Sequence, residues 1–161
     1  MADFEKAIMK TLIHEGGATI TDDPDDRGGL TRYGISQRAY PNLDISNLTE
    51  QQAKDIYKRD YWDKVKGDEI DKQQVAESIF DTAVNMGVRT ASRLAQLAAD
   101  IPNVDGVIGE QSVAKVNSID SQLFLAEFAL VKIARYANIC TKNSSQRKYL
   151  LGWINRTLTS V

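Results

Sequence analysis

The sequence predicts a mainly α-helical single domain with a small β-hairpin or loop subdomain after the first helix. Apolar residues recur at three- and four-residue spacing along most of the chain, which is the pattern of amphipathic helices. Between residues 18 and 36 this period disappears, and the run TDDPDDRGG gathers turn formers between the β-prone pieces ATIT and LTRYGIS. No internal repeat or long linker divides the 161 residues, so we expect one compact unit over 1–161.

Composition excludes several classes of protein. With 42% hydrophobic and 26% charged residues, the chain is typical of soluble globular proteins. No stretch approaches the roughly 18 apolar residues of a membrane-spanning helix, so no stable membrane insertion is expected. The formal net charge of -2 argues against nonspecific binding of nucleic acid. One histidine and one cysteine, Cys140, exclude an internal disulfide and are too few for a usual zinc site, so we predict no metal.

The first helix is predicted over residues 3–15, and it ends on a carboxylate. One face carries a stripe spaced by four, four and three residues, at Phe4, Ile8, Leu12 and Glu15. The next two residues are glycines, which favour the left-handed conformation that ends a helix. Glu15 is therefore expected in the last turn, at the end of an apolar stripe.

Six further helices are predicted from the same period. The second begins near Thr49, where Gln52 completes a reciprocal capping arrangement. The others are expected over residues 73–86, 90–99, 110–116, 121–140 and 144–157. Residues 111–161 hold seven Lys or Arg against two acids. This basic balance fits an anionic polymer and a solvated helix face equally well.

Glu15 has the setting of a general acid. Hydrolysis of a glycosidic bond needs a carboxyl that holds its proton near neutral pH. Burial along the apolar stripe and the negative end of the helix would both favour the protonated form of Glu15. Its position alone also fits an exposed acid at a helix end, because glutamate is rarely buried. His14 points away from the face of Glu15 in a regular helix and receives no catalytic role.

Within the loop that follows, Asp26 and Thr31 are the expected partners of Glu15. A hairpin there would fold polar groups back toward the helix end, where they would hold a sugar, stabilise positive charge at the anomeric carbon and position water. The alternative for the acidic run at residues 22–26 is a solvated turn or a calcium loop. The spacing does not match the twelve-residue EF-hand pattern.

The segment HEGGATITDDPDDRGGLTRYGIS closely resembles glycoside hydrolase family 108, the phage and prophage N-acetylmuramidases also known as secretion activators. The matching residues are Glu15, Gly16, Gly17, Asp23, Pro24, Asp26, Gly28, Gly29, Thr31, Gly34 and Ile35. The chain departs from the family pattern at Ala18, where an aromatic residue is usual, and about two extra residues separate Gly17 from Asp23.

The resemblance implies a lysozyme-like fold and a catalytic role for Glu15, with Asp26 and Thr31 assigned by their places in the motif. The second half continues it, because FDTAVNMG, DGVIGEQS and LGWINR look like the predicted peptidoglycan-binding region that accompanies the family. Residues 1–72 are then the catalytic helix, hairpin and following helix, and residues 73–161 the binding-type helical region. For DGVIG, an ordinary turn between helices is favoured over direct contact with the glycan.

Candidates for substrate contact are Tyr33, Tyr61, Trp62 and Asn85. Aromatic faces pack against sugar rings, and an amide bonds their hydroxyl groups. For Tyr61 and Trp62, a place in the core is an equally good interpretation. Phe80 and Trp153 belong to apolar helical patterns and are predicted to be packing residues.

The leading hypothesis is hydrolysis of the β-1,4 bond between N-acetylmuramic acid and N-acetylglucosamine in peptidoglycan glycan strands, without a cofactor and with inversion favoured. A lytic transglycosylase, which leaves an anhydro sugar, and a non-catalytic peptidoglycan-binding or secretion-associated module are the alternatives. The N-terminal segment carries acids where a secretory signal has bases. We therefore expect synthesis in the bacterial host cytoplasm. The resemblance to phage muramidases implies a protein, expected to be a monomer, that reaches the cell wall after a separate holin opens the membrane.

Overall fold

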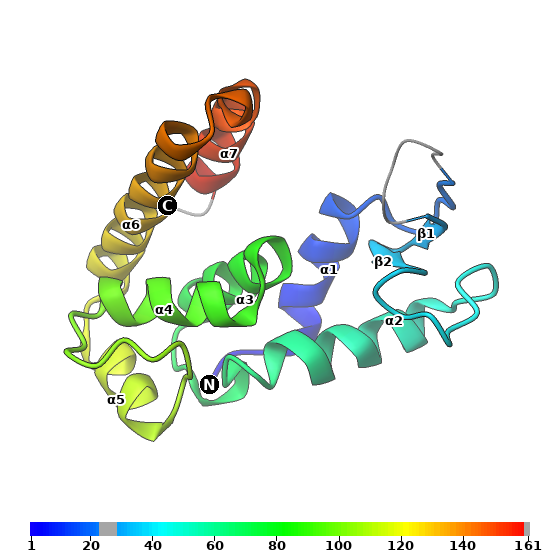
Figure 1. Cartoon of the computed structure of the whole chain (residues 1–161). Coiled ribbons are helices and arrows are strands. Elements are labelled where there is room, and N and C mark those ends of the chain that lie inside the picture. The colour runs from blue at the N-terminus through cyan, green and yellow to red at the C-terminus, as the bar shows by residue number, and fades with distance from the viewer. Residues whose placement is uncertain (23–28, 160–161) are drawn as a thin grey trace.

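The structure is a computed structural model that describes residues 1–22 and 29–159. Within these ranges, seven α-helices and one two-stranded antiparallel hairpin make up most of the regular structure, joined by short 3-10 and π segments (Figure 1). The predicted fold class, mainly α with a small hairpin after the first helix, is confirmed. No helix among the described residues is both long and apolar enough to cross a membrane.

Helix α1 (Phe4–His14) begins and ends where its local chemistry predicts. The Asp3 carboxylate caps it by accepting the N–H of Glu5 at 2.9 Å. Glu15 is the C-terminal cap residue, and its N–H still donates to the carbonyl of Thr11 at 2.9 Å. Gly16 and Gly17 follow with φ of 87° and 59°, and they turn the chain out of the helix directly after Glu15.

The hairpin pairs β1 (Thr31–Arg32) with β2 (Ile35–Ser36). Its two-residue turn is formed by Tyr33 and Gly34, both with positive φ, as a tight hairpin turn of this kind requires. The predicted β-prone piece ATIT contributes only one bridge, between Thr21 and Thr31. The Tyr33 N–H donates to the carbonyl of Gly17 at 3.0 Å, so the turn is held against the end of α1.

Helix α2 (Glu50–Tyr57) begins with the predicted capping box between Thr49 and Gln52. It continues as a π-helical segment, η1 (Lys58–Trp62), which the apolar periodicity does not predict. A short 3-10 segment, η2 (Gly67–Glu69), then lies so close to the Trp62 ring that a side chain at Gly67 would overlap it.

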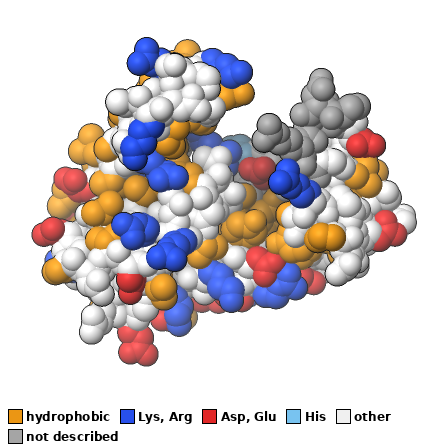
Figure 2. All heavy atoms as spheres, viewed as in Figure 1, with side chains coloured by type: hydrophobic (Ala, Val, Ile, Leu, Met, Phe, Trp, Pro, Cys, Tyr) orange, Lys and Arg blue, Asp and Glu red, His pale blue; other side chains and the backbone are white. Residues whose placement is uncertain are grey.

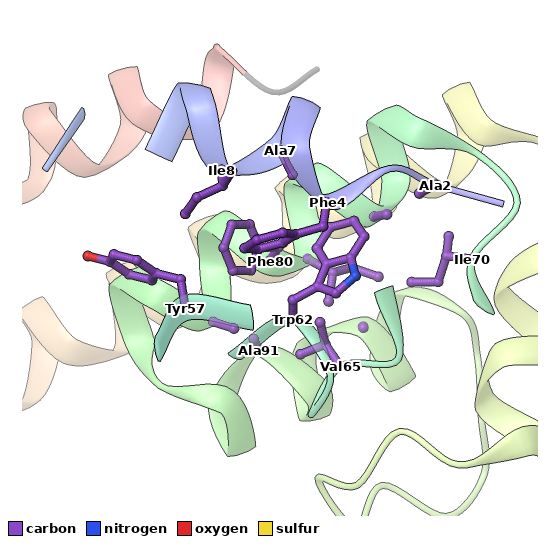
Figure 3. Close-up of a cluster of buried hydrophobic side chains, with 14 of the residues drawn as sticks. Ala2, Phe4, Ala7, Ile8, Tyr57, Trp62, Val65, Ile70, Phe80 and Ala91 are labelled. Carbon is purple, nitrogen blue, oxygen red and sulfur yellow. The ribbon is translucent and has the colours of Figure 1, made fainter. Parts of the chain in front are cut away.

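An aromatic cluster ties α1, η1 and α3 (Gln73–Met86) together. Phe4, Trp62 and Phe80 lie 5.5–6.0 Å apart between ring centroids, and Figure 3 shows them converging from these three elements. Burying each large apolar side chain stabilises the fold by about 1.5–3 kcal/mol, so this cluster anchors the three elements to one another. Phe80 is 1% exposed and packs as predicted.

The C-terminal half contains α4 (Val88–Ala98), α5 (Glu110–Ser118), α6 (Ser121–Lys142) and α7 (Leu150–Leu158). Helices α6 and α7 form an antiparallel pair that projects from the rest of the molecule (Figure 1), and we call this pair the arm. The predicted helix over residues 144–157 is divided, because its first part is the 3-10 segment η3 (Ser144–Tyr149). Trp153 stacks on Tyr136 at 5.2 Å, and Cys140 is buried within the arm.

Candidate active site

The surface is hollowed between two lobes, as Figure 2 shows. One lobe is the arm, and the other contains the hairpin; the C-terminal end of α1 lies between them (Figure 1). The hollow is partly lined by apolar side chains in this view. Any group presented by the end of α1 is therefore available to a chain lying in this groove.

Glu15 contacts both lobes of the groove. On the hairpin side, the backbone of Gly34 packs against it so closely that a Cβ there would lie 2.7 Å from the Glu15 Cβ. On the arm side, Glu15 Oε1 accepts from Nη2 of Arg156 at 3.4 Å. A quarter of the Glu15 side chain remains exposed to solvent. The carboxyl is thus held by its neighbours and still reachable from outside.

Tyr57 stands behind the hairpin turn. Its hydroxyl donates to the Tyr33 carbonyl at 2.9 Å, and a Cβ on Gly34 would lie 2.6 Å from the same oxygen. Burial, followed by the negative charge of Glu15, raises the pKa of Tyr57 above its ordinary value. The phenol therefore stays neutral and keeps its hydrogen bond to the turn that covers Glu15.

Arg156 lies in the last turn of α7, and no sequence motif marks it as a site residue. Its guanidinium donates to both carboxylate oxygens of Asp81 on α3, from Nη2 at 2.8 Å and from Nε at 3.2 Å. Burial lowers the pKa of Arg156, but the carboxylates of Asp81 and Glu15 outweigh that effect and hold it above the ordinary value. His14 completes the cluster, with Nδ1 3.8 Å from Asp81 Oδ1.

Of the two expected partners of Glu15, the structure describes Thr31 but not Asp26. Thr31 begins strand β1 on the hairpin that also holds Gly34, and its hydroxyl donates to the Gly29 carbonyl at 3.0 Å. Asp26 lies outside the described residues. The structure therefore brings Thr31 into the same lobe as the turn that covers Glu15, and the role assigned to Asp26 stays a prediction.

Trp62 is a correction to the predicted substrate contacts. Its side chain is fully buried, and its indole N–H donates to Asp68 at 2.7 Å, so it cannot stack on a ligand. The sequence could not distinguish this outcome from a surface position, because Tyr61 and Trp62 are adjacent aromatic residues and their spacing does not show which of them faces inward.

The other three predicted contacts differ in their access to solvent. Tyr33 forms the hairpin turn but is only 8% exposed, which leaves little of its ring for a ligand. Tyr61 is half-buried and lies 5.6 Å from Tyr57 between ring centroids. Asn85 is exposed on α3, one turn beyond Asp81 and on the same helix face.

The DGVIG motif has an internal role in this structure. The buried side chain of Gln96 accepts the N–H of Gly106 at 2.9 Å and donates to the Asp105 carboxylate at 2.8 Å and the Val107 carbonyl at 3.0 Å. Gly106 has φ of 82° and packs against Arg89 and Arg93. These contacts account for the motif as a turn between helices.

A separate cavity of about 290 Å³ lies between α1, α3 and α6, on walls that include Lys10, His14, Glu77 and Asp81. Glu15 does not line it. Lys10 and Glu77 are paired across it at 2.6 Å. The cavity therefore adjoins the Asp81 side of the charged cluster rather than the groove that exposes Glu15.

The fold and the groove define the class of protein: it is mainly α and lysozyme-like, and its candidate acid lies at a helix end between two lobes. Residues 8–87 match the model of the glycosyl hydrolase 108 family, and residues 83–158 match that of a predicted peptidoglycan domain. The chain belongs to glycosyl hydrolase family 108 and carries a peptidoglycan domain as its second part. It is thus a glycoside hydrolase of a peptidoglycan-acting family, as the sequence resemblance implies.

A solved structure is similar to nearly the whole chain. SagA from Brucella abortus is similar to it over 97% of this chain and 94% of that chain, with 27% sequence identity and a TM-score of 0.73. No curated protein matches the sequence.

Proposed function

We propose that this protein is an N-acetylmuramidase that hydrolyses the β-1,4 bond between N-acetylmuramic acid and N-acetylglucosamine, with Glu15 as the general acid. The observation that carries the proposal is the place of Glu15: a partly exposed carboxyl at the end of α1, covered by the hairpin turn on one side and facing the arm on the other. The family match supplies the reaction class and the polymer.

In the proposed reaction, a glycan strand lies in the groove with the scissile oxygen beside Glu15. The carboxyl donates its proton to that oxygen as the bond to the anomeric carbon breaks. Water adds to the anomeric carbon, and its proton is released to solvent. Asp26 and Thr31 are the proposed groups that position this water. Inversion is expected if they do so, and retention if a carboxylate attacks the carbon directly.

The proposed biological role is that of a phage-type endolysin acting on the cell wall. The support is the resemblance of the glycine-rich segment to phage and prophage muramidases. In that role a monomer made in the bacterial cytoplasm reaches peptidoglycan through membrane lesions formed by a separate holin. Lysis from within by the protein with a holin, and no lysis by the protein alone, is the expected result.

Clearing of purified Gram-negative peptidoglycan tests the assignment of Glu15. We expect Glu15→Gln to lose about 10²-fold or more of the turbidity rate, because a positioned general acid typically contributes 10² to 10⁴. Glu5→Gln is the matched control, since Glu5 is exposed on the same helix. Circular dichroism must first show that all three proteins are equally folded. A fully active Glu15→Gln would overturn the proposal.

Product analysis separates the alternatives. Mass spectrometry of the digest should show reducing ends formed by addition of water. Anhydro-muramic ends without added water would identify a lytic transglycosylase instead. If the folded wild type binds the wall but releases no product, the protein is a non-catalytic peptidoglycan-binding module.

A further inference from the structure

The region matched to the peptidoglycan domain supplies a charged group to the candidate acid of the hydrolase region. Arg156 Nη2 lies 3.4 Å from Glu15 Oε1, across 141 residues of sequence. We propose that Arg156 is a positioning residue for the Glu15 reaction: it orients the carboxyl and stabilises the negative charge that Glu15 acquires on donating its proton. This inference rests on the proposed function and adds a residue and a region to its active site.

Asp81 fixes the orientation of the Arg156 guanidinium. Asp81 binds the guanidinium through two hydrogen bonds, so the plane of the group is set from α3 rather than by Glu15. The same Nη2 nitrogen lies 2.8 Å from Asp81 and 3.4 Å from Glu15. The contact with Glu15 is the longer and weaker one, and it leaves the acid free to form a hydrogen bond to a substrate.

Partial burial strengthens the interaction between the charge of Arg156 and the carboxyl of Glu15. The side chains of Arg156, Glu15 and Asp81 are 25–29% exposed, so water screens their interaction less than it would at an open surface. Other titratable groups face the cluster from each neighbouring element, namely His14 on α1, Tyr57 on α2, Tyr61 on η1 and Lys132 on α6. Arg156 forms an ion pair with Glu15 at 3.4 Å.

The chemical consequence follows from the direction of proton transfer. As the proton leaves Glu15 for the glycosidic oxygen, the carboxyl becomes an anion beside a fixed cation. That cation lowers the energy of the charge-separated transition state. A fixed cation favours the ionised form of a neighbouring carboxyl in general, so the pH dependence of the rate is a suitable readout of this contact.

The decisive comparison is between Arg156→Met and Arg147→Met. Arg147 is exposed in η3, so its variant removes the same charge from the same lobe without touching Glu15. With solubilised glycan strands as substrate, we expect Arg156→Met to lower kcat about 3- to 30-fold and to leave KM within about twofold. The alkaline limit of its pH–rate profile should move upward by half a unit or more. Arg147→Met should match the wild type in kcat and in pH profile.

Asp81→Asn provides a second and opposite test. It removes a negative charge from the cluster and releases the guanidinium toward Glu15, so its alkaline limit should move downward. Arg156→Met and Asp81→Asn each remove one partner of the same ion pair. If both fold and shift the pH–rate profile in opposite directions, a merely structural role of Arg156 does not explain the result. If instead both leave the alkaline limit and kcat unchanged, the inference is wrong.

Chemical rescue covers the case in which the methionine variant is poorly folded. Guanidinium chloride at tens of millimolar, well below denaturing concentrations, should raise the kcat of Arg156→Ala severalfold and leave the wild type unchanged. Arg156→Lys should keep more activity than Arg156→Ala, because it retains the charge. If guanidinium does not raise the kcat of Arg156→Ala, and Arg156→Lys is no more active than Arg156→Ala, the inference is wrong.

Failure of the inference and failure of the proposed function give different results. An inactive Glu15→Gln with wild-type behaviour of Arg156→Met keeps the muramidase assignment and removes Arg156 from the site. A raised KM at unchanged kcat in Arg156→Met would assign it to wall binding and also overturn the inference. If Glu15→Gln is active, the proposed function with Glu15 as the general acid is itself wrong.

Discussion

The two walls of the groove are built differently. The wall that carries Glu15 is attached to an aromatic core in which Phe4, Trp62 and Phe80 are each no more than 8% exposed. The opposite wall is the arm, whose last helix buries Thr157 alone among its described residues and leaves Leu151 and Leu158 at 71% and 59% exposed. The helix that carries the acid is therefore anchored by strong packing, whereas the helix that carries Arg156 is weakly packed and the guanidinium is held by Asp81 on α3.

The difference implies that activity and global stability should respond to different residues. Substitutions in the core should unfold the protein. Substitutions in the arm should move Arg156 relative to Glu15 while most of the fold persists, because local opening of weakly packed elements costs less than global unfolding. The following predictions test this contrast, beginning with the largest expected effect.

The two tryptophans offer the most direct test. Trp62→Ala removes a fully buried ring and should lower the free energy of unfolding by about 3–5 kcal/mol. Trp153→Ala removes a half-buried ring that stacks on Tyr136 and should cost clearly less, about 1–2 kcal/mol. Urea unfolding followed by circular dichroism measures both values. Equal losses would show that the arm is as firmly packed as the core.

Gly34→Ala should affect the acid and the stability together. The new Cβ would lie 2.6 Å from the Tyr57 hydroxyl and 2.7 Å from the Glu15 Cβ, at a backbone φ of 75°. We expect a stability loss of about 1–3 kcal/mol and a marked fall in kcat. Gly17→Ala is the control, because its φ of 59° is also positive but no atom lies within 4 Å of the added carbon. Equal kcat in the two variants would contradict the close packing of the turn on Glu15.

Lys132 should give the arm its own pH dependence. Burial lowers the pKa of Lys132 to about 8, with Asp81 opposing the shift and Arg156 adding to it. Below pH 8 the lysine is charged in both states, and the folded state bears the cost of burying that charge. Between pH 8 and the ordinary lysine value of 10.5, the folded state loses its proton first, so the free energy of unfolding should rise, by about 1–2 kcal/mol.

Urea unfolding at several pH values between 7.5 and 10 measures this rise. Lys132→Met should flatten the slope over that range, whereas Lys115→Met, at an exposed position on α5, should preserve it. A slope that is the same in Lys132→Met and in the wild type would disprove the assignment.

The helix caps should produce the smallest effects. Asp120 caps α6 by accepting the N–H groups of Gln122 and Leu123 at 3.0 and 3.1 Å, and Asp3 caps α1 through Glu5. Each substitution by alanine should cost about 1 kcal/mol. Hydrogen exchange should rise mainly in the arm for Asp120→Ala and across the N-terminal core for Asp3→Ala. The same exchange pattern in both variants would show that the two walls do not differ in local stability.

The sequence predicted what depends on neighbours in the chain. The capping box at Thr49, the end of α1 at Glu15 and the boundaries of α3 follow from residues within one or two helical turns, and each lies where predicted. The π segment η1 and the 3-10 start of the last helix were missed, because their spacing of apolar residues also fits an α-helix.

The candidate site was only half predictable for the same reason. Glu15 ends a local apolar stripe, but Arg156 reaches it from the last helix, and nothing in the local sequence distinguishes that arginine from an exposed one. Trp62 and Tyr61 are adjacent, yet one is fully buried and the other half-buried, because tertiary packing against Phe4 and Phe80 decides which side of the segment faces inward.

The placement of the two tryptophans also provides an optical assay. Trp62 is sealed in the core and Trp153 is half-exposed in the arm, so their fluorescence should differ in emission wavelength and in access to soluble quenchers such as iodide. Replacing either one with phenylalanine would leave a single tryptophan, and its emission can be excited selectively over that of the six tyrosines. Glycan titrations monitored in the two single-tryptophan proteins would then record motion of the arm and of the core separately, without any attached dye.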